Sequence, residues 1–352
     1  MLLPDATTAS AFTQHTLANG LRAVVEVMPD ADSAACGFLV RTGSRDDPAD
    51  IAGVAHFLEH MMFKGTARRT WEQINIAFDE MGSFYNAYTS RDRTFYHGWV
   101  PRDALEAQME LLADMMRSTL PPEEFETERN VVLEEIAMAG DELSSCAYDF
   151  LYEQACPGSS LAWPVLGRES TIAGMARDRM VEYFRRRYAP NNLVFLAAGD
   201  IDPEAVLRRL ESLAGDWEPV DPGPGSPAPA LRSGRAARQI ERFHQQAVML
   251  AFPSAPAAHP LAEAAEAAAA VLGGNNSRFY WNIVQQGLCT RAGCFHDDYA
   301  DFGMTVMYAL CEPENCEAVL EAMRREAGNL SLIHISEPTR LLSISYAVFC
   351  LK

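Results

Sequence analysis

Two histidines spaced for a shared metal ion are the most chemically informative residues of this sequence. His56 and His60 lie four positions apart, so on a helix their imidazoles project from one face about one turn apart. Such a pair also occurs by chance on surfaces and in cores. Glu59 favours the metal site, because it flanks the same face and could reach a metal-bound water without binding the metal itself.

Periodicity and turn signals predict the helices and strands that position His56, Glu59 and His60. Apolar residues recur at helical spacing over 51–64 and Gly65 follows, which predicts a helix that carries both histidines. Strand-like segments at 15–17 and 21–27 flank an Asn-Gly turn signal and predict a hairpin. Further strands are expected at 34–42, 83–88, 94–99, 192–199 and 246–253, and helices at about 71–81, 102–117, 123–139, 177–187, 203–214 and 262–272.

A Pro- and Gly-rich stretch divides the chain into two expected domains. Residues 217–237 cannot continue a helix or a central strand, so we expect a linker between a domain at 1–216 and a second at 238–330. The residue pattern of 331–352 neither completes a helix nor matches that of the preceding 330 residues, and it resembles translated sequencing-adapter DNA. That interpretation makes them a non-native tail and leaves the second domain truncated; an ordinary pair of C-terminal strands is the alternative.

Composition limits the classes of partner. Acidic residues outnumber basic ones by 48 to 29, and a net charge of -19 repels phosphate backbones, so we expect no nucleic-acid partner. The eight cysteines include no C-x-x-C pair, which favours reduced thiols over a disulfide framework. The first residues lack the pattern of a secretory signal, and no apolar run reaches 18 residues, so a cytoplasmic protein without a membrane span is expected.

Three segments carry a resemblance to a known family. Residues 17–22 read L-A-N-G-L-R, residues 53–66 read G-V-A-H-F-L-E-H-M-M-F-K-G-T, and residues 86–90 read N-A-Y-T-S. They resemble the opening hairpin, zinc helix and cleft strand of the pitrilysin/insulinase family of inverted-motif (H-x-x-E-H) zinc peptidases, in its two-domain processing-peptidase-like branch. The resemblance implies an α+β fold with two related αβ half-shell domains, whose antiparallel-rich sheets are flanked by helices.

The resemblance also implies a third metal ligand. The family takes it from a helix of the form E-R-x-x-V-x-x-E, which residues 128–135 match, and this assigns Glu135. Glu134 points about 100° away around the helix and is the alternative if the register is shifted by one residue. Glu128 lies two turns before Glu135 on the same stripe, where it would orient a ligand or a neighbouring water; an ordinary exposed helix glutamate is the alternative.

The implied activity is that of a zinc-dependent metalloendopeptidase acting on peptides or unfolded segments. One Zn²⁺ per chain on His56, His60 and Glu135 would leave a fourth position for water, and Glu59 would act as general base. The Asn86 to Thr89 strand would bind the peptide substrate as an added strand beside the metal. The other interpretation is simply a buried strand, and both can hold at the same time. The implied substrate-binding residues are Asn86, Ala87, Tyr88 and Thr89.

The second domain departs from the family pattern at two positions. Val284 and Thr290 occupy the places of an Arg and a Tyr that bind substrate in the family. The departure implies a metal-bearing subunit whose homologous partner subunit supplies the pair; alternatively, Arg278 or Arg291 holds the substrate. An inactive, scaffold-type relative and a truncated chain without activity are the other interpretations.

Overall fold

The computed structural model describes residues 11–333 and 347–351, and these divide into two compact units. Unit 1 comprises Met1–Ile136 with Pro164–Gly225, and unit 2 comprises Ala137–Trp163 with Ser226–Lys352. The segment 137–163 was expected in the first domain. It groups with unit 2 because its helix packs against a strand of that unit, and because Tyr152 donates a hydrogen bond to Asp297.

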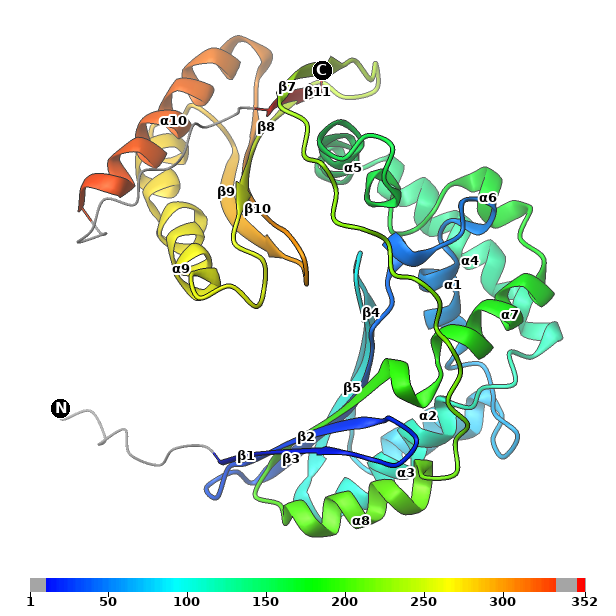
Figure 1. The fold of residues 1–352 in the computed structure, drawn as a ribbon. Helices are drawn as coiled ribbons and strands as arrows, with labels where there is room; N and C mark the ends of the chain where they lie inside the picture. Colours follow the sequence, from blue (N-terminus) through cyan, green and yellow to red (C-terminus); the bar gives the residue numbers. More distant parts are fainter. Residues whose placement is uncertain (1–10, 334–346, 352) are drawn as a thin grey trace. The chain divides into compact units, whose positions relative to one another are not determined.

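Unit 1 is built on a six-stranded sheet with the strand order β1-β2-β6-β3-β5-β4. Neighbouring strands run antiparallel except β2 and β6, which are parallel. β1 and β4 are therefore the edge strands of this sheet. The strands are β1 Ala11–Thr16, β2 Arg22–Val27, β3 Ser33–Val40, β4 Phe84–Thr89, β5 Thr94–Pro101 and β6 Leu193–Gly199 (Figure 1).

The expected hairpin between β1 and β2 is confirmed. Gly20 has φ +87°, a conformation that a residue with a side chain adopts only under strain. Asn19 accepts a hydrogen bond from the backbone N–H of Leu21 and donates one to the carbonyl of Ala214 at 2.7 Å. The turn is thus tied to a helix end almost 200 positions away in the sequence.

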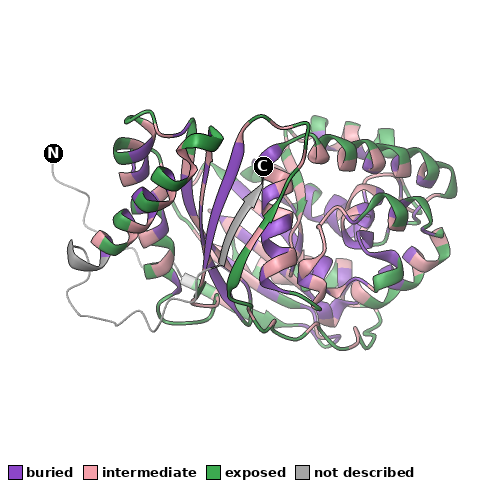
Figure 2. Ribbon diagram, turned by 90° about the horizontal axis from the view of Figure 1, so that it is seen from above, coloured by how far each residue is buried: buried purple, intermediate pink, exposed green. Residues whose placement is uncertain are grey.

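The helices of unit 1 cover one face of its sheet (Figure 1). Phe38, Tyr96 and Phe195 come from three neighbouring strands and are fully buried. Along β5 and β6, buried residues alternate with more exposed ones, as expected for strands covered on one face. Figure 2 shows buried segments along the strands. The helices are α1 Val54–Met61, α2 Trp71–Glu80, α3 Leu105–Met115, α4 Pro122–Gly140, α6 Glu169–Ala173, α7 Arg177–Arg187 and α8 Pro203–Ala214.

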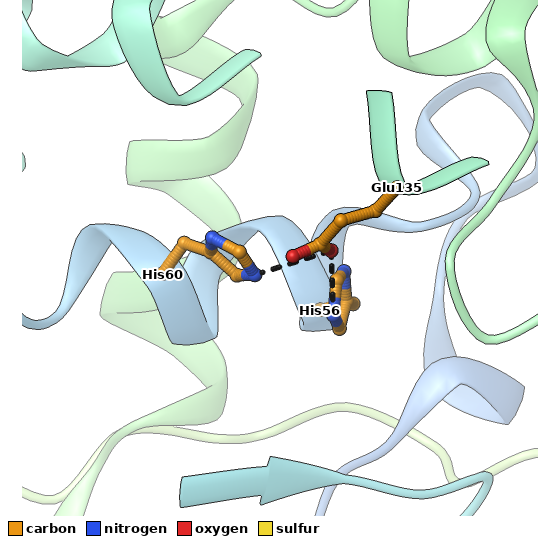
Figure 3. Close-up of side chains that lie close together, drawn as sticks. All are labelled: His56, His60 and Glu135. Carbon is orange, nitrogen blue, oxygen red and sulfur yellow. Dashed lines mark ion pairs between the residues drawn. The ribbon is translucent and has the colours of Figure 1, made fainter. Parts of the chain in front are cut away.

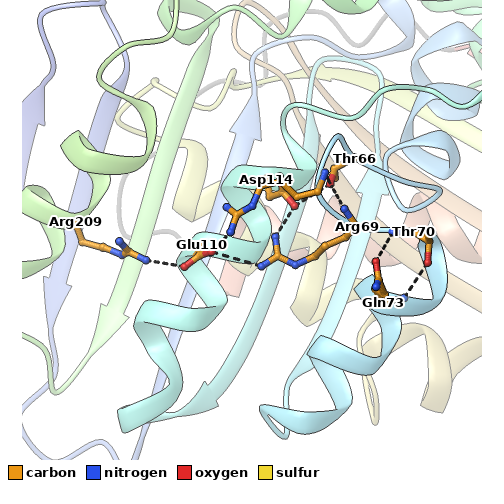
Figure 4. Close-up of polar contacts among 8 residues, drawn as sticks. Thr66, Arg69, Thr70, Gln73, Glu110, Asp114 and Arg209 are labelled. Carbon is orange, nitrogen blue, oxygen red and sulfur yellow. Dashed lines mark hydrogen bonds and ion pairs between the residues drawn. The ribbon is translucent and has the colours of Figure 1, made fainter.

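A polar network anchors the connection from α1 to α2 onto α3 and α8 (Figure 4). The carboxylate of Asp114 accepts hydrogen bonds from Thr66 at 2.9 Å and from Arg69 at 2.5 Å. Glu110, one turn earlier on α3, pairs with Arg209 of α8 at 2.9 Å. Exposed pairs of this kind contribute little stability one by one, but Asp114 is largely buried, so its two bonds hold the segment between α1 and α2 against α3.

Unit 2 contains a five-stranded sheet with the order β7-β11-β8-β10-β9, which is antiparallel except for the parallel pair β7 and β11. Residues 217–233 run as irregular backbone, and 234–237 of the expected linker belong to β7. The strands are β7 Gly234–Arg238, β8 Gln246–Ser254, β9 Arg291–Asp298, β10 Gly303–Cys311 and β11 Ala347–Leu351. The helices are α5 Leu143–Ala155, α9 Ala262–Gly273, α10 Cys316–Ile333 and a π-helical turn, Tyr280–Val284.

The expected α+β class with antiparallel-rich sheets flanked by helices is confirmed in both units. Of the expected non-native tail, 331–333 end α10, 347–351 form β11, and 334–346 and 352 lie outside the described residues. The pairing of β11 says nothing about the origin of these residues. Among the described helices, none combines the length and the apolar character that crossing a membrane requires.

Candidate metal centre

Helix α1 presents its two histidines on the face turned away from the core. Gly53 starts the helix with φ +96°, and a Cβ there would come within 2.7 Å of the backbone of Gly167. The opposite face, which includes Phe57 and Leu58, is fully buried. Core packing therefore fixes the rotation of α1 and leaves the rings of His56 and His60 together, with 4.8 Å between their centroids.

Glu135 of α4 completes a cluster with these histidines (Figure 3). Its Oε2 lies 3.6 Å from His56 Nε2 and 3.5 Å from His60 Nε2, and the three ligand atoms lie within 4.8 Å of one another. Among the described residues this is the one group of three or more His, Cys, Asp or Glu side chains with such spacing. Glu134 is exposed on α4 and is not part of the group.

The cluster fits a zinc ion by distance and by donor type. Bonds of about 2.0–2.2 Å in a tetrahedron place ligand atoms about 3.3–3.6 Å apart, which matches the separations from Glu135 to both histidines. Two imidazoles and one carboxylate are also a ligand set of catalytic zinc sites. Burial, with the charge of His60 nearby, lowers the pKa of His56 to about 3, so this ring is kept in the neutral form that binds metals.

Glu128 contacts His60 at Nδ1, the ring nitrogen that does not face Glu135. Its Oε2 lies 3.2 Å from His60 Nδ1, and its Oε1 lies 2.7 Å from Lys64 Nζ. A hydrogen bond from Nδ1–H to this carboxylate leaves Nε2, which faces Glu135, free to bind a metal ion. Burial alone would lower the pKa of His60, but the hydrogen bond to Glu128 and the nearby Glu135 raise it. Glu128 is buried, so the alternative of an exposed helix glutamate is wrong.

Glu59 lies beside the cluster without belonging to it. Thr89, the last residue of β4, donates a hydrogen bond to Glu59 with 2.5 Å between the oxygens. Burial raises the pKa of Glu59, and the charge of Glu135 adds to the effect, although the bond from Thr89 opposes it. A carboxylate with a raised pKa is a stronger base than an ordinary glutamate.

The strand that precedes Thr89 is an open edge. Asn86 and Tyr88 are exposed and Ala87 is half-buried, so the alternative of a buried strand is wrong for β4 within unit 1. The backbone N–H of Ala87 donates to the side chain of Asn86 at 2.9 Å instead of to a neighbouring strand. An edge with such a group turned outward can accept an added strand.

In unit 2 the two arginines considered as substrate binders differ in their surroundings. Arg278 makes two hydrogen bonds to the buried carboxylate of Glu326, at 2.7 and 3.1 Å. Arg291 is exposed at the start of β9, 6.0 Å from the ring of Tyr308. Arg278 is thus held by a structural ion pair, which leaves Arg291 as the more available of the two.

Two family models match the chain. The one described as Insulinase (Peptidase family M16) matches residues 22–169, which include all three residues of the metal cluster, and the Peptidase M16 inactive domain matches 174–337. An uncharacterized zinc protease of Streptomyces coelicolor is 32% identical over 326 residues, covering 90% of this chain and 71% of the relative. The chain belongs to the M16 peptidase family. The resemblance to the insulinase family stated above is therefore confirmed.

Further relatives extend this similarity. The uncharacterized zinc protease YmxG of Bacillus subtilis is 32% identical over 320 residues, with 90% of this chain and 78% of the relative covered. Among solved structures, a protease from Helicobacter pylori has a TM-score of 0.85 at 23% identity, over 94% of this chain and 82% of that one. A putative M16-like peptidase from Alicyclobacillus acidocaldarius has a TM-score of 0.75 at 21% identity, over 96% and 81%. These structures support the two-domain M16 fold.

Proposed function

We propose that this M16 protein is a zinc metalloendopeptidase that hydrolyses peptide bonds in peptides or unfolded segments. The observation that carries the proposal is the cluster of His56, His60 and Glu135, with Glu59 beside it on the helix of the two histidines. The relatives named zinc proteases support the metal and the reaction class. An intact donor set argues against the inactive scaffold, because a scaffold has no need to keep three ligands and a base together.

Each residue of the site has a separate role in the proposed reaction. His56, His60 and Glu135 would hold Zn²⁺, which when bound polarises the substrate carbonyl and lowers the pKa of water. Glu59 accepts the proton of the attacking water and passes it to the amine that leaves when the peptide bond breaks. Thr89 holds the carboxylate of Glu59 in place for both transfers. Glu128 keeps His60 in the tautomer that binds metal.

Substrate binding is assigned to the edge of β4. An extended peptide paired with residues 86–89 would lie beside the strand whose last residue bonds Glu59, so its backbone would run past the metal cluster. Asn86 would release the N–H of Ala87 to the peptide carbonyl. Main-chain pairing of this kind recognises an extended conformation and suits unfolded segments.

A metal-bearing subunit of a heteromeric peptidase is the second candidate. Val284 and Thr290 stand at the two substrate-binding positions, and Arg278 is already paired with Glu326. A homologous partner would then supply the missing side chains. Complex III2 from Candida albicans, an assembly in which one chain has this fold with a TM-score of 0.75, is consistent with M16-type chains working beside others.

Metal content with reversible chelation tests the leading proposal. The purified chain should contain about one zinc ion and hydrolyse an unfolded protein substrate. It should lose that activity when a chelator removes the metal and regain it when Zn²⁺ is added back. Protein that binds no zinc would overturn the proposal. Zinc without hydrolysis, followed by hydrolysis once a second chain from the source organism is added, would favour the heteromeric form; full activity of this chain alone would exclude it.

A further inference from the structure

One face of the unit 1 sheet carries exposed aromatic side chains. The helices pack on the face to which Tyr96 of β5 points, and strand residues on the other face stay partly or largely exposed. Phe84 of β4 is 60% exposed and Trp99 of β5 is 45% exposed. Contiguous exposed apolar side chains are uncommon on soluble proteins and commonly mark a binding surface.

These side chains are packed against one another. The rings of Phe84 and Trp99 stack with centroids 4.2 Å apart at 17° between their planes. Nearer the other end of β4, Phe95 and His97 stack at 4.8 Å, and Tyr88 meets both rings edge-on at 6.0 and 6.4 Å. Mutual stacking holds the rings in fixed orientations without covering them, so these protein side chains would lose little conformational entropy when a ligand binds there.

The aromatic face is continuous with the peptide-binding edge. A peptide added to β4 would place every second side chain on this face, because side chains alternate along a strand. Thr89 marks the end of β4 at Glu59, and Phe84 lies five residues away, a distance of about 16 Å along a strand. The side chain that meets Phe84 and Trp99 would therefore sit about five residues from the bond that is cut.

We propose that Phe84 and Trp99 form a subsite, remote from the metal centre, for an apolar or aromatic side chain of the peptide substrate. The inference rests on the proposed function, since it assumes a peptide paired with β4. The stacked rings of Phe84 and Trp99 favour an apolar or aromatic side chain, because they provide apolar contact area and ring faces and edges against which another aromatic ring can pack. The enzyme would then prefer peptides with an apolar residue at this distance from the cleavage site.

A positional peptide series tests the subsite. The background protein is Glu59→Gln, so that binding is measured without turnover, and the probes are labelled peptides of equal length in which one Phe moves along a Ser- and Thr-rich chain. We expect the dissociation constant to be lowest with Phe at the position described. The double substitution F84S/W99T should weaken that peptide about 3- to 10-fold and leave the others unchanged.

Matched variants separate this subsite from general damage. Phe12→Ser removes an equally exposed ring, 60%, from β1 at the opposite edge of the same sheet, and should leave every dissociation constant unchanged. The conservative pair F84Y/W99F should keep the preference. Zinc content and thermal unfolding of each variant establish that it is folded.

The outcomes distinguish the subsite from the proposed function. F84S/W99T protein that keeps the full positional preference overturns the subsite, even if the wild type is an active zinc peptidase. A wild type without hydrolysis, whose peptide preference is nevertheless abolished by F84S/W99T, retains the subsite and overturns the proposed activity. A wild-type dimer that the double substitution splits would make this face an interface between copies and overturn the inference.

Discussion

Thr89 donates a hydrogen bond to Glu59 with 2.5 Å between Thr89 Oγ1 and Glu59 Oε2, although the two residues are 30 positions apart in the sequence. This contact joins the strand proposed to bind substrate to the residue proposed to move the proton. The rotamer of the base is thereby set by the same element that would position the peptide.

Thr89→Val tests this coupling. Valine keeps the shape of threonine and removes the hydroxyl, so we expect kcat to fall by between about 10- and 100-fold, the usual range for losing a hydrogen bond to a charged group. Zinc content should not change, because Thr89 is not part of the metal cluster. Thr127→Val, at an exposed position of α4, is the control. Wild-type kcat in Thr89→Val would show that the contact has no catalytic role.

Adjacent glutamates on α4 should respond oppositely to substitution. Glu135→Gln removes a charged ligand from the cluster and should abolish tight zinc binding together with hydrolysis. Glu134→Gln changes an exposed residue and should do neither. Zinc affinity measured by competition with a chelator distinguishes the two variants. The reverse pattern would mean that Glu134 is the ligand.

Glu128→Gln should weaken zinc binding without removing a ligand. The carboxylate orients His60, and loss of such an outer partner commonly costs about 10- to 100-fold in metal affinity. Glu123→Gln, an exposed residue of the same helix, provides the comparison. If both variants bind zinc as tightly as the wild type, Glu128 has only a structural role.

Much of this site could be predicted from the sequence because its information is local. His56, Glu59 and His60 lie within about one helical turn of one another. Glu135 lies 75 positions after His60, and its assignment over Glu134 came from the resemblance of residues 128–135 to the family's ligand helix. The aromatic residues of β4 were visible as a strand, but whether that strand is buried or an open edge depends on its neighbours in the sheet. Periodicity does not contain that information.

The interactions that escaped prediction join distant segments. Lys64 was visible in the motif around the histidines, yet its partner Glu128 lies on another helix. Helix α5 follows α4 closely in the sequence, and only its packing on β8 and the bond from Tyr152 to Asp297 place it with unit 2. Such pairings depend on tertiary structure and leave no signal in composition or spacing.

Asp47 should make stability depend on pH. Burial raises its pKa to about 8, despite hydrogen bonds from the backbone N–H of Gly53 and from Tyr183, whereas the unfolded chain has the ordinary value of about 3.9. Between these two values the folded state binds more protons than the unfolded state. The free energy of unfolding should therefore decrease as pH rises from about 4 to 8 and stop changing for this reason above that range.

Urea unfolding of metal-free protein at several pH values, with wild type and Asp47→Asn compared, measures this contribution. Asparagine stays neutral throughout, so the difference in unfolding free energy between the two proteins should vary with pH, with the wild type losing more stability as pH rises. A constant difference across the range would show that Asp47 has the same pKa in both states.

The most direct test of the central claim is zinc content and peptide hydrolysis of the wild type and Glu59→Gln, prepared side by side. We predict about one zinc ion per chain in both proteins and hydrolysis by the wild type alone, because Glu59 moves the proton but does not bind the metal. Hydrolysis by Glu59→Gln at the wild-type rate, or loss of its zinc, would contradict the assignment of Glu59 as the general base beside a site formed by His56, His60 and Glu135.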